Sequence, residues 1–223
     1  MKQGRRVLPL FFIRRISDIM LLYFERRMRA MIKALSELSD EQKSQFIDLY
    51  YESFILDIDK KRKHEDKLKS IFGSAFLEGF AAAYIEDERV AGLVAYSNNK
   101  HSALKFDKQV CKQQLGKILG DIQHGIFEGF FGKATAKGDD EGYIDFLAVH
   151  EDYRRRGIAT KLLEYAYAQE NKPKYILGVM TKNEKAKKLY VKQGYVKYEV
   201  KKSLIIRIAL GDTVDMMRLN RNV

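Results

Sequence analysis

Two stretches in the second half of the chain decide the fold: YIDFLAVHEDYRRRGIAT at residues 143–160 and KYILGVMTKNEKAKKLYVKQGY at residues 174–195. Tyr143–Val149 and Lys174–Met180 are rich in β-branched and aromatic residues, which is typical of strands. We expect one helix to begin near Gly157 and a second to cover Asn183–Gln193, where Gly194 ends it. Strands and helices that alternate at these lengths predict a parallel β–α–β crossover.

The turn that follows the first of these strands has the features of a phosphate-binding site. The start of a helix presents unpaired backbone N–H groups and a partial positive charge. Gly157 lets the backbone approach a ligand closely, and Ala159 keeps the next turn narrow. The same residues are also compatible with an ordinary basic turn at the start of a helix. The segment comprises Arg154, Arg155, Arg156, Gly157, Ile158, Ala159 and Thr160.

The second helix places Asn183, Ala186 and Tyr190 on one face, because they are spaced i, i+3 and i+7. A small residue between two polar ones suits an extended ligand that lies against the helix. A capping asparagine and a core tyrosine on an amphipathic helix would give the same pattern.

Together the two segments resemble the GNAT superfamily of N-acetyltransferases. The turn fits the motif Gln/Arg-x-x-Gly-x-Gly/Ala, and the helix fits Asn-x-x-Ala-x-x-Leu-Tyr-x-x-x-Gly-Phe/Tyr through Gly194 and Tyr195. The resemblance implies an α/β (α+β) fold, with a mixed, mostly antiparallel sheet, a parallel β–α–β cofactor-binding core and helices on both faces.

The resemblance also implies acetyl-CoA as co-substrate. The backbone of Leu147, Ala148 and Val149 would pair with the pantetheine arm, and the turn from Arg154 to Thr160 would hold the pyrophosphate. Asn183, with Ala186 beside it, would contact the pantetheine or position the thioester. Tyr190 would give a proton to the departing thiolate.

The general base is less clearly marked. Asp145 lies on the cofactor strand, and strict alternation predicts that it shares a face with Leu147 and Val149. A carboxylate in a covered strand needs a reason to be there. It could equally be a solvated residue near the start of the strand, and Glu141 is a weaker candidate.

The rest of the chain fits one domain over residues 31–223, preceded by a basic amphipathic arm at residues 1–30. We expect strands at Ile32–Leu38, Tyr195–Arg207 and Val214–Leu219, and a hairpin of Phe80–Ile85 with Val90–Tyr96. We expect a helix after a capping box at Ser39 and Gln42, and another over Lys60–Phe72. A helix-like stripe also runs over Phe11–Met31. We favour a docking helix, or sequence upstream of a later start codon at Met28 or Met31, over a membrane-surface or partner-binding helix.

A helical insertion is expected at about residues 99–142, where the chain departs from the short connection of the family. Its glycines suggest close packing or a bend. It is either a wall or lid of the acceptor pocket, which we favour, or a helix that covers the edge of the sheet. Its candidate residues are His101, Asp121, His124, Phe127, Glu128, Phe130 and Phe131.

Composition narrows the functional classes. The single cysteine, Cys111, excludes an internal disulfide and a cysteine-based zinc cluster, and four scattered histidines show no metal-ligand spacing, so we expect no metal. Of the net charge of +11, +6 falls in residues 1–31, so charge is a poor argument for nucleic-acid binding.

No apolar run is long enough for a membrane span. Arginines follow directly after the short apolar stretch at Val7–Ile13, which argues against a signal peptide. A reducing, cytoplasmic location is the natural interpretation.

The sequence therefore predicts acetyl transfer from acetyl-CoA to a primary amine by direct attack in a ternary complex, without a covalent acyl-enzyme. The alternative is a GNAT-fold module that binds acyl-CoA without turnover, as a sensor or partner-binding subunit. Binding of nucleic acid or of a membrane surface through the basic arm is a third hypothesis. The acceptor can be a small molecule or a protein, the acyl group can be longer than acetyl, and pairing of exposed edge strands makes a homodimer possible.

Overall fold

The computed structural model describes residues 30–59, 61–133, 136–202 and 211–221. Seven strands form one sheet in the order β1-β2-β3-β4-β5-β7-β6, in which only β4 and β5 are parallel. This confirms the expected mixed, mostly antiparallel sheet with a parallel core. The strands are β1 Met31–Ala34, β2 Ala81–Glu86, β3 Arg89–Ser97, β4 Glu141–Val149, β5 Lys174–Met180, β6 Val196–Lys201 and β7 Val214–Asn220.

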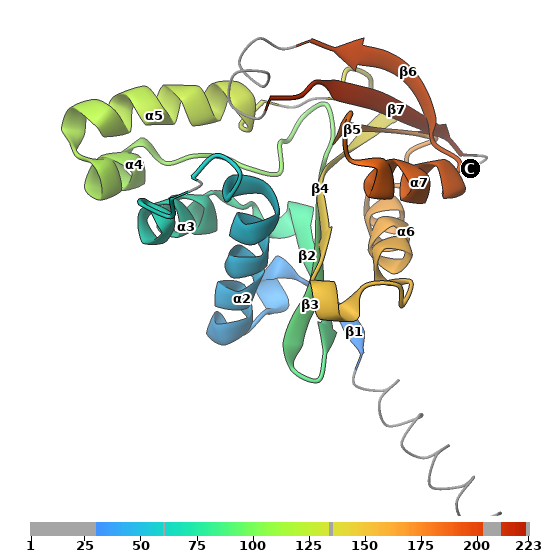
Figure 1. The fold of residues 1–223 in the computed structure, drawn as a ribbon, viewed down its shortest axis with the longest axis horizontal. Helices are drawn as coiled ribbons and strands as arrows, with labels where there is room; N and C mark the ends of the chain where they lie inside the picture. The colour runs from blue at the N-terminus through green and yellow to red at the C-terminus, as the bar shows by residue number, and fades with distance from the viewer. Residues whose placement is uncertain (1–29, 60, 134–135, 203–210, 222–223) are drawn as a thin grey trace, which may run out of the picture.

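Helices cover both faces of the sheet (Figure 1). On one face, the helices labelled α2 to α5 enclose an aromatic core around Phe46, Tyr50 and Phe72. On the other face, the helices labelled α6 and α7 enclose a second core around Leu162, Tyr175 and Tyr195. The helices are α2 Asp40–Tyr50, α3 Glu65–Ala75, α4 Lys108–Leu115, α5 Lys117–Phe130, α6 Ile158–Glu170 and α7 Glu184–Lys192, with a π-helix, η2, at Tyr51–Ile55.

The local signals in the first half have clear structural causes. Ser39 caps α2 by accepting from the backbone N–H of Gln42, whose side chain accepts from the N–H of Ser39, so the predicted capping box is confirmed. β2 and β3 form the predicted hairpin. Its two-residue turn, Asp87-Glu88, has positive φ at both positions, as in the type I′ turns that match the twist of a hairpin.

Several predicted boundaries were wrong. The strand expected over Ile32–Leu38 ends at Ala34, because Leu35–Glu37 turns into a short 3-10 helix and buries Leu35. The helix expected over Lys60–Phe72 begins at Glu65 and ends at Ala75, because the segment before it is held in a loop by polar contacts. The expected strand from Tyr195 to Arg207 is seen as β6, and residues 203–210 lie outside the described residues. So does the expected N-terminal helix, apart from Ala30 and Met31, of which Met31 begins β1.

The segment at 99–142 contains a bend and a close contact, as its glycines suggested. Gly116, at φ +85°, separates α4 from α5. A Cβ on Gly120 would lie 2.6 Å from the backbone O of Cys111, so α5 passes α4 at a distance that only glycine allows.

Gly120→Ala is therefore expected to lower the free energy of unfolding by about 1–3 kcal/mol, because the two helix backbones must separate. Gly129→Ala is the matched control, because it lies in the same helix and its Cβ would meet nothing within 4 Å. There the higher helix propensity of alanine should raise the stability by up to about 1 kcal/mol. Urea unfolding of both variants checks this, and equal stability of the two would contradict the close packing of α4 and α5.

Candidate active site

A divergence of the two central strands creates the candidate site. β4 pairs with β5 only through Glu141–Ile144 and Lys174–Leu177. Beyond these pairs β4 continues to Val149 alongside β3, while the end of β5 continues alongside β7. The far half of β4, which includes Leu147, Ala148 and Val149, therefore has no described strand on its β5 side. Its free backbone groups can receive an extended ligand as an added strand.

A β-bulge accompanies this divergence and changes the position of Asp145. Ala95 pairs with Phe146 and Tyr96 with Ile144, so Asp145 is the extra residue. Ile144 consequently packs in the α6–α7 core with Leu147 and Val149. Asp145 instead lies beside Tyr50, which belongs to the α2–α3 core. The expectation that Asp145 shares a face with Leu147 and Val149 was wrong, because strict alternation does not hold across a bulge.

The environment of Asp145 suits a general base. Burial raises its pKa to about 7, and the neighbouring Ser97 hydroxyl offsets this only in part. Asp145 Oδ2, Ser97 Oγ and Tyr50 Oη are all buried without a hydrogen-bond partner among the described residues. Burial raises the pKa of Tyr50 well above its usual value, and the charge of Asp145 adds to this. A carboxyl group with such a pKa can both accept and release a proton near neutral pH.

The predicted phosphate turn lies between β4 and α6. Gly157 forms the N-cap of α6 with φ +78°, a left-handed conformation that favours glycine. Two of the three arginines are engaged within the protein: Arg154 Nε donates to the Val149 carbonyl at 3.1 Å, and Arg156 pairs with Glu86 at 3.0 Å. Arg155 is exposed and makes no hydrogen bond or ion pair to a described residue. The first helical residues, Ile158, Ala159 and Thr160, follow with their N–H groups at the free end of α6.

Arg155→Ala is expected to weaken acetyl-CoA binding by roughly 10- to 100-fold, because a charge-assisted contact to phosphate contributes about 1.5–3 kcal/mol. Lys63→Ala, which removes an exposed positive charge before α3, should leave the affinity unchanged. Calorimetric titration at two salt concentrations separates a specific contact from general electrostatic attraction. Equal losses of affinity in both variants would remove Arg155 from the site.

The position of α6 depends on a close contact with β3. A Cβ on Gly92 would lie 3.0 Å from the Ala148 carbonyl, from Ile158 and from Leu162. The absence of a side chain at Gly92 therefore lets the start of α6 settle against β3 and β4. The side chain of Gln193 after α7 donates to Thr160 at 3.0 Å, which ties the ends of α6 and α7 together.

On α7, Asn183 and Tyr190 have defined local roles. Asn183 is the N-cap, and its side-chain oxygen accepts from the N–H of Ala186 at 3.1 Å, which leaves its NH₂ group for a ligand. Tyr190 is buried in the same core that Leu147 and Val149 contact, and its ring lies 5.7 Å from that of Tyr195. The Tyr190 hydroxyl, like that of any ordinary tyrosine, is protonated at neutral pH and can donate, and burial raises its pKa further.

Opposite α7, aromatic side chains surround the bulge. The rings of Tyr50 and Phe54 lie 5.0 and 5.1 Å from that of Phe146, which follows Asp145. Phe131, just after α5, lies 6.2 Å from the same ring. Phe54, Phe131 and Phe146 are only partly buried, so this side of β4 is an apolar approach to Asp145.

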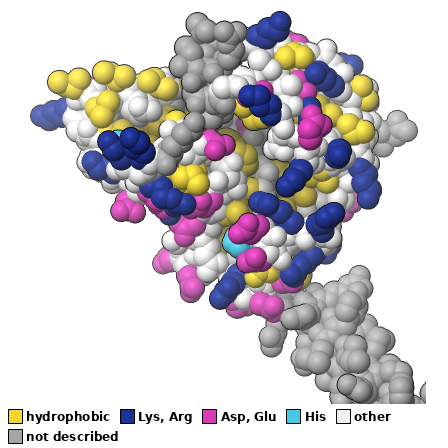
Figure 2. Space-filling model, in the orientation of Figure 1, with side chains coloured by type: hydrophobic (Ala, Val, Ile, Leu, Met, Phe, Trp, Pro, Cys, Tyr) yellow, Lys and Arg dark blue, Asp and Glu magenta, His cyan; other side chains and the backbone are white. Residues whose placement is uncertain are grey.

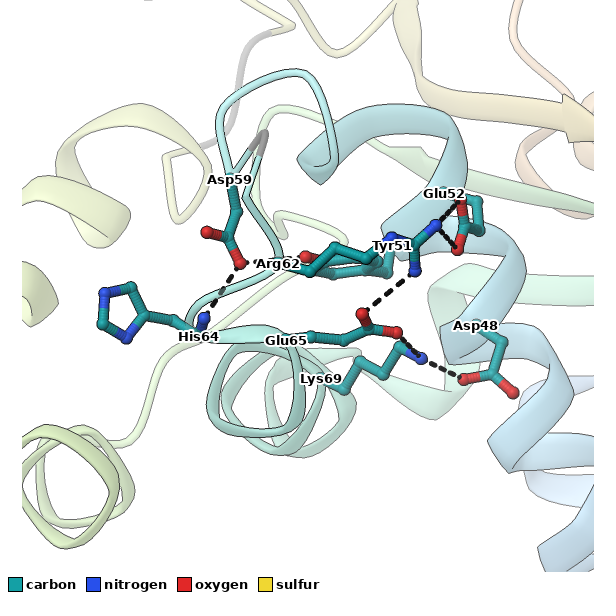
Figure 3. Close-up of polar contacts among 8 residues, drawn as sticks. All are labelled: Asp48, Tyr51, Glu52, Asp59, Arg62, His64, Glu65 and Lys69. Carbon is teal, nitrogen blue, oxygen red and sulfur yellow. Dashed lines mark hydrogen bonds and ion pairs between the residues drawn. The ribbon is translucent and has the colours of Figure 1, made fainter.

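A polar network beside η2 holds this aromatic side in place (Figure 3). Tyr51 donates to Asp59 at 2.9 Å; burial and this bond raise the pKa of Tyr51 to about 12. Arg62 and Lys69 bridge carboxylates from both sides of the loop before α3, and Arg62 sits between its two acidic partners at 2.7 and 3.0 Å. The network comprises Asp48, Tyr51, Glu52, Asp59, Arg62, His64, Glu65 and Lys69.

The polar residues predicted for the insertion serve mainly to attach α5. His124 and Glu128 contact the backbone of Phe106 at 3.2 and 2.6 Å, and Asp121 pairs with lysines of α4. Phe127 is buried, and the ring of Phe131 contacts that of Phe146 on β4. Glu141, the weaker candidate base, pairs with Lys174 at 3.0 Å; burial raises its pKa, but a bond from the Lys137 N–H and the Lys174 charge bring it below the usual value.

Sequence reasoning missed Tyr50, Ser97 and Asp215. Asp215 is buried on β7, accepts from Thr181 at 2.9 Å and pairs with Lys197 at 2.9 Å. Burial raises its pKa, but these partners outweigh burial and lower it overall. The one available signal was an acidic residue within the apolar run Val214–Met217. Tyr50 and Ser97 have no such signal, because their relation to Asp145 depends on the bulge.

Other features of the described residues lie outside this site. A hollow of about 270 Å³ lies between α2 and α3 and is lined by Lys43, Ile47 and Lys69. Among all the described residues, no group of three or more His, Cys, Asp or Glu side chains could hold a metal ion. None of the helices within the described ranges is long and apolar enough to cross a membrane.

Comparison with known proteins agrees with this geometry. A family model described as "Acetyltransferase (GNAT) family" matches residues 38–195, more than half of the chain. The chain belongs to the GNAT acetyltransferase family. The match includes the divergent strands, the turn before α6 and α7, so the predicted resemblance is confirmed.

Solved structures show the same fold. An N-acetyltransferase from Staphylococcus aureus Mu50 is 17% identical, with a TM-score of 0.53 over 85% of this chain and 100% of that one. Ard1 from Thermoplasma volcanium is 16% identical, with a TM-score of 0.52 over 87% and 99%. At these identities the likeness concerns the fold alone. A search of curated proteins by sequence finds no match.

Proposed function

We propose that this GNAT-family chain transfers an acetyl group from acetyl-CoA to a primary amine. One observation carries the proposal: β4 and β5 diverge beyond Ile144, and the open side of β4 leads directly to the free start of α6. A thioester on an extended, phosphate-bearing carrier fits this arrangement. Its arm would pair with Leu147–Val149, and its pyrophosphate would meet the N–H groups after Gly157 and the side chain of Arg155.

The two candidate proton-transfer groups belong to opposite faces of the sheet. Asp145 lies beside Tyr50 on the α2 side, and Tyr190 lies in the core on the α7 side. A thioester held between the diverging strands would therefore be open to the amine on one face, while the thiolate leaves on the other. This arrangement supports direct transfer in a ternary complex.

In the proposed step, Asp145 accepts a proton from the amine as its nitrogen attacks the thioester carbon. The C–N bond forms, the carbonyl electrons move to oxygen, and backbone N–H groups at the free edge of β4 stabilise that charge. The carbonyl then re-forms, the C–S bond breaks with its electron pair on sulfur, and Tyr190 gives its proton to that sulfur. The site holds both reactants in contact, which converts an encounter in solution into a step within the complex.

Incubation of the purified chain with radiolabelled acetyl-CoA and cell extract tests the proposal. Label in the small-molecule fraction would assign a metabolite acceptor, and label in the protein fraction would assign a protein acceptor for mass spectrometry to locate. Tight binding of acetyl-CoA without labelling would instead favour a sensor or partner-binding module, and parallel trials with longer acyl-CoA donors test for a different acyl group.

A further inference from the structure

The outward face of α5 is apolar along its whole length. Its large side chains are exposed by 40–80%, and Ile118 is the most exposed of them. Two glycines lie on the same face, and a Cβ on either would meet nothing within 4 Å. Yellow side chains along this helix line the upper left of Figure 2. The face comprises Ile118, Leu119, Ile122, Gly125, Ile126, Gly129 and Phe130.

This face is separate from the side of α5 that packs on the protein. Phe127 and Gly120 point inward, and His124 and Glu128 attach the helix through the backbone of Phe106. The helix therefore stays in place without its outer face being covered. A contiguous exposed apolar patch of roughly a few hundred Å² is often a site of interaction with another molecule.

The residues of α5 that border the face carry no Lys or Arg. At 100° per residue, Gln123 and Asp121 border the apolar arc on its two sides. Asp121 already pairs with Lys108 and Lys112 at 3.0 and 3.2 Å. Helices that lie on anionic membranes carry Lys or Arg beside the apolar face, and nucleic-acid surfaces carry them throughout. The occupant should therefore be apolar and uncharged.

We propose that this face binds the same face of a second copy of the chain. Isoleucines at 118, 122 and 126 stand beside the open glycines at 125 and 129, so the surface carries both projections and hollows. In a two-fold symmetric interface the projections of one copy would fill the hollows of the other. The glycines would lie where the helices cross, because backbones approach most closely there. The helix is about 21 Å long, so the dimer should be small and of modest affinity.

Sedimentation velocity of the full chain over about a hundredfold concentration range tests this. We expect a shift from monomer to dimer, and Ile122→Glu should weaken the dimer at least tenfold. Ile58→Glu is the matched control, because Ile58 is similarly exposed, by 53% against 56%, but lies in the loop before α3. A monomer throughout, or a dimer unaffected by Ile122→Glu, would overturn the proposal.

Gly125→Leu separates a close helix pair from other apolar occupants. The Cβ that it adds would meet nothing within 4 Å, and the longer side chain adds apolar surface, so it should strengthen binding to a membrane. In the proposed dimer it should instead weaken association, because the helix backbones can no longer approach. Flotation with vesicles of phosphatidylcholine and phosphatidylserine supplies the second readout. Stronger vesicle binding by Gly125→Leu without any dimer would assign the face to membranes and overturn the proposal.

Discussion

Replacing Tyr190 by Phe is expected to lower turnover by about 10²- to 10³-fold and leave acetyl-CoA affinity nearly unchanged. The variant keeps the buried ring that packs on Tyr195 and removes only the hydroxyl that would protonate the leaving thiolate. Release of free thiol with an acceptor identified by labelling gives the rate, and calorimetry gives the affinity.

Tyr198→Phe is the control for this variant, because Tyr198 is an exposed tyrosine on β6. It should behave as wild type in both measurements. If Tyr190→Phe transfers acetyl groups as fast as Tyr198→Phe, then Tyr190 is a core residue and another group, or water, protonates the thiolate.

Replacing Asp145 by Asn is expected to lower turnover by about 10²- to 10⁴-fold, because an amide cannot accept the proton of the amine. The wild-type rate should rise with pH until Asp145 is ionised, at about pH 7, and this limb should disappear in the variant. Glu141→Gln, at the weaker candidate base, should retain the limb. A wild-type pH profile in Asp145→Asn, or its loss in Glu141→Gln, would contradict the assignment.

The same substitution should change stability in a direction set by the raised pKa. The unfolded carboxyl titrates near pH 3.9 and the folded one near 7, so the folded state binds the proton more tightly between these values. Stability should therefore fall as pH rises from about 4 to 7 and stay reduced above it. Asp145→Asn should remove this fall and be more stable than wild type at pH 8 by a few kcal/mol. Equal unfolding curves at pH 8 would show that Asp145 is not buried as described.

The parts of the fold and site that the sequence predicts are those with local causes. The capping pair at Ser39 and Gln42, the glycine at φ +78° before α6 and the asparagine that caps α7 each act within a few residues of themselves. They therefore leave spacings that can be recognised without a structure.

The parts that the sequence does not predict depend on pairing between distant segments. The bulge at Asp145 arises from the register between β3 and β4, so strict alternation gave the wrong face and no pattern linked it to Tyr50 or Ser97. The segment at 99–142, where a helical insertion was expected, contains α4 and α5. The sequence could not show that Ile118 and Ile122 lie outward, because an apolar pattern does not reveal which segment, if any, covers it.

Hydrogen–deuterium exchange with and without acetyl-CoA would show whether the co-substrate binds along β4. If acetyl-CoA lies between the diverging strands, amides in Leu147–Val149 and in the first turn of α6 should exchange more slowly when it is bound. The edge strand β1 should show no change. Protection confined to the hollow between α2 and α3, or no protection at β4, would contradict this account.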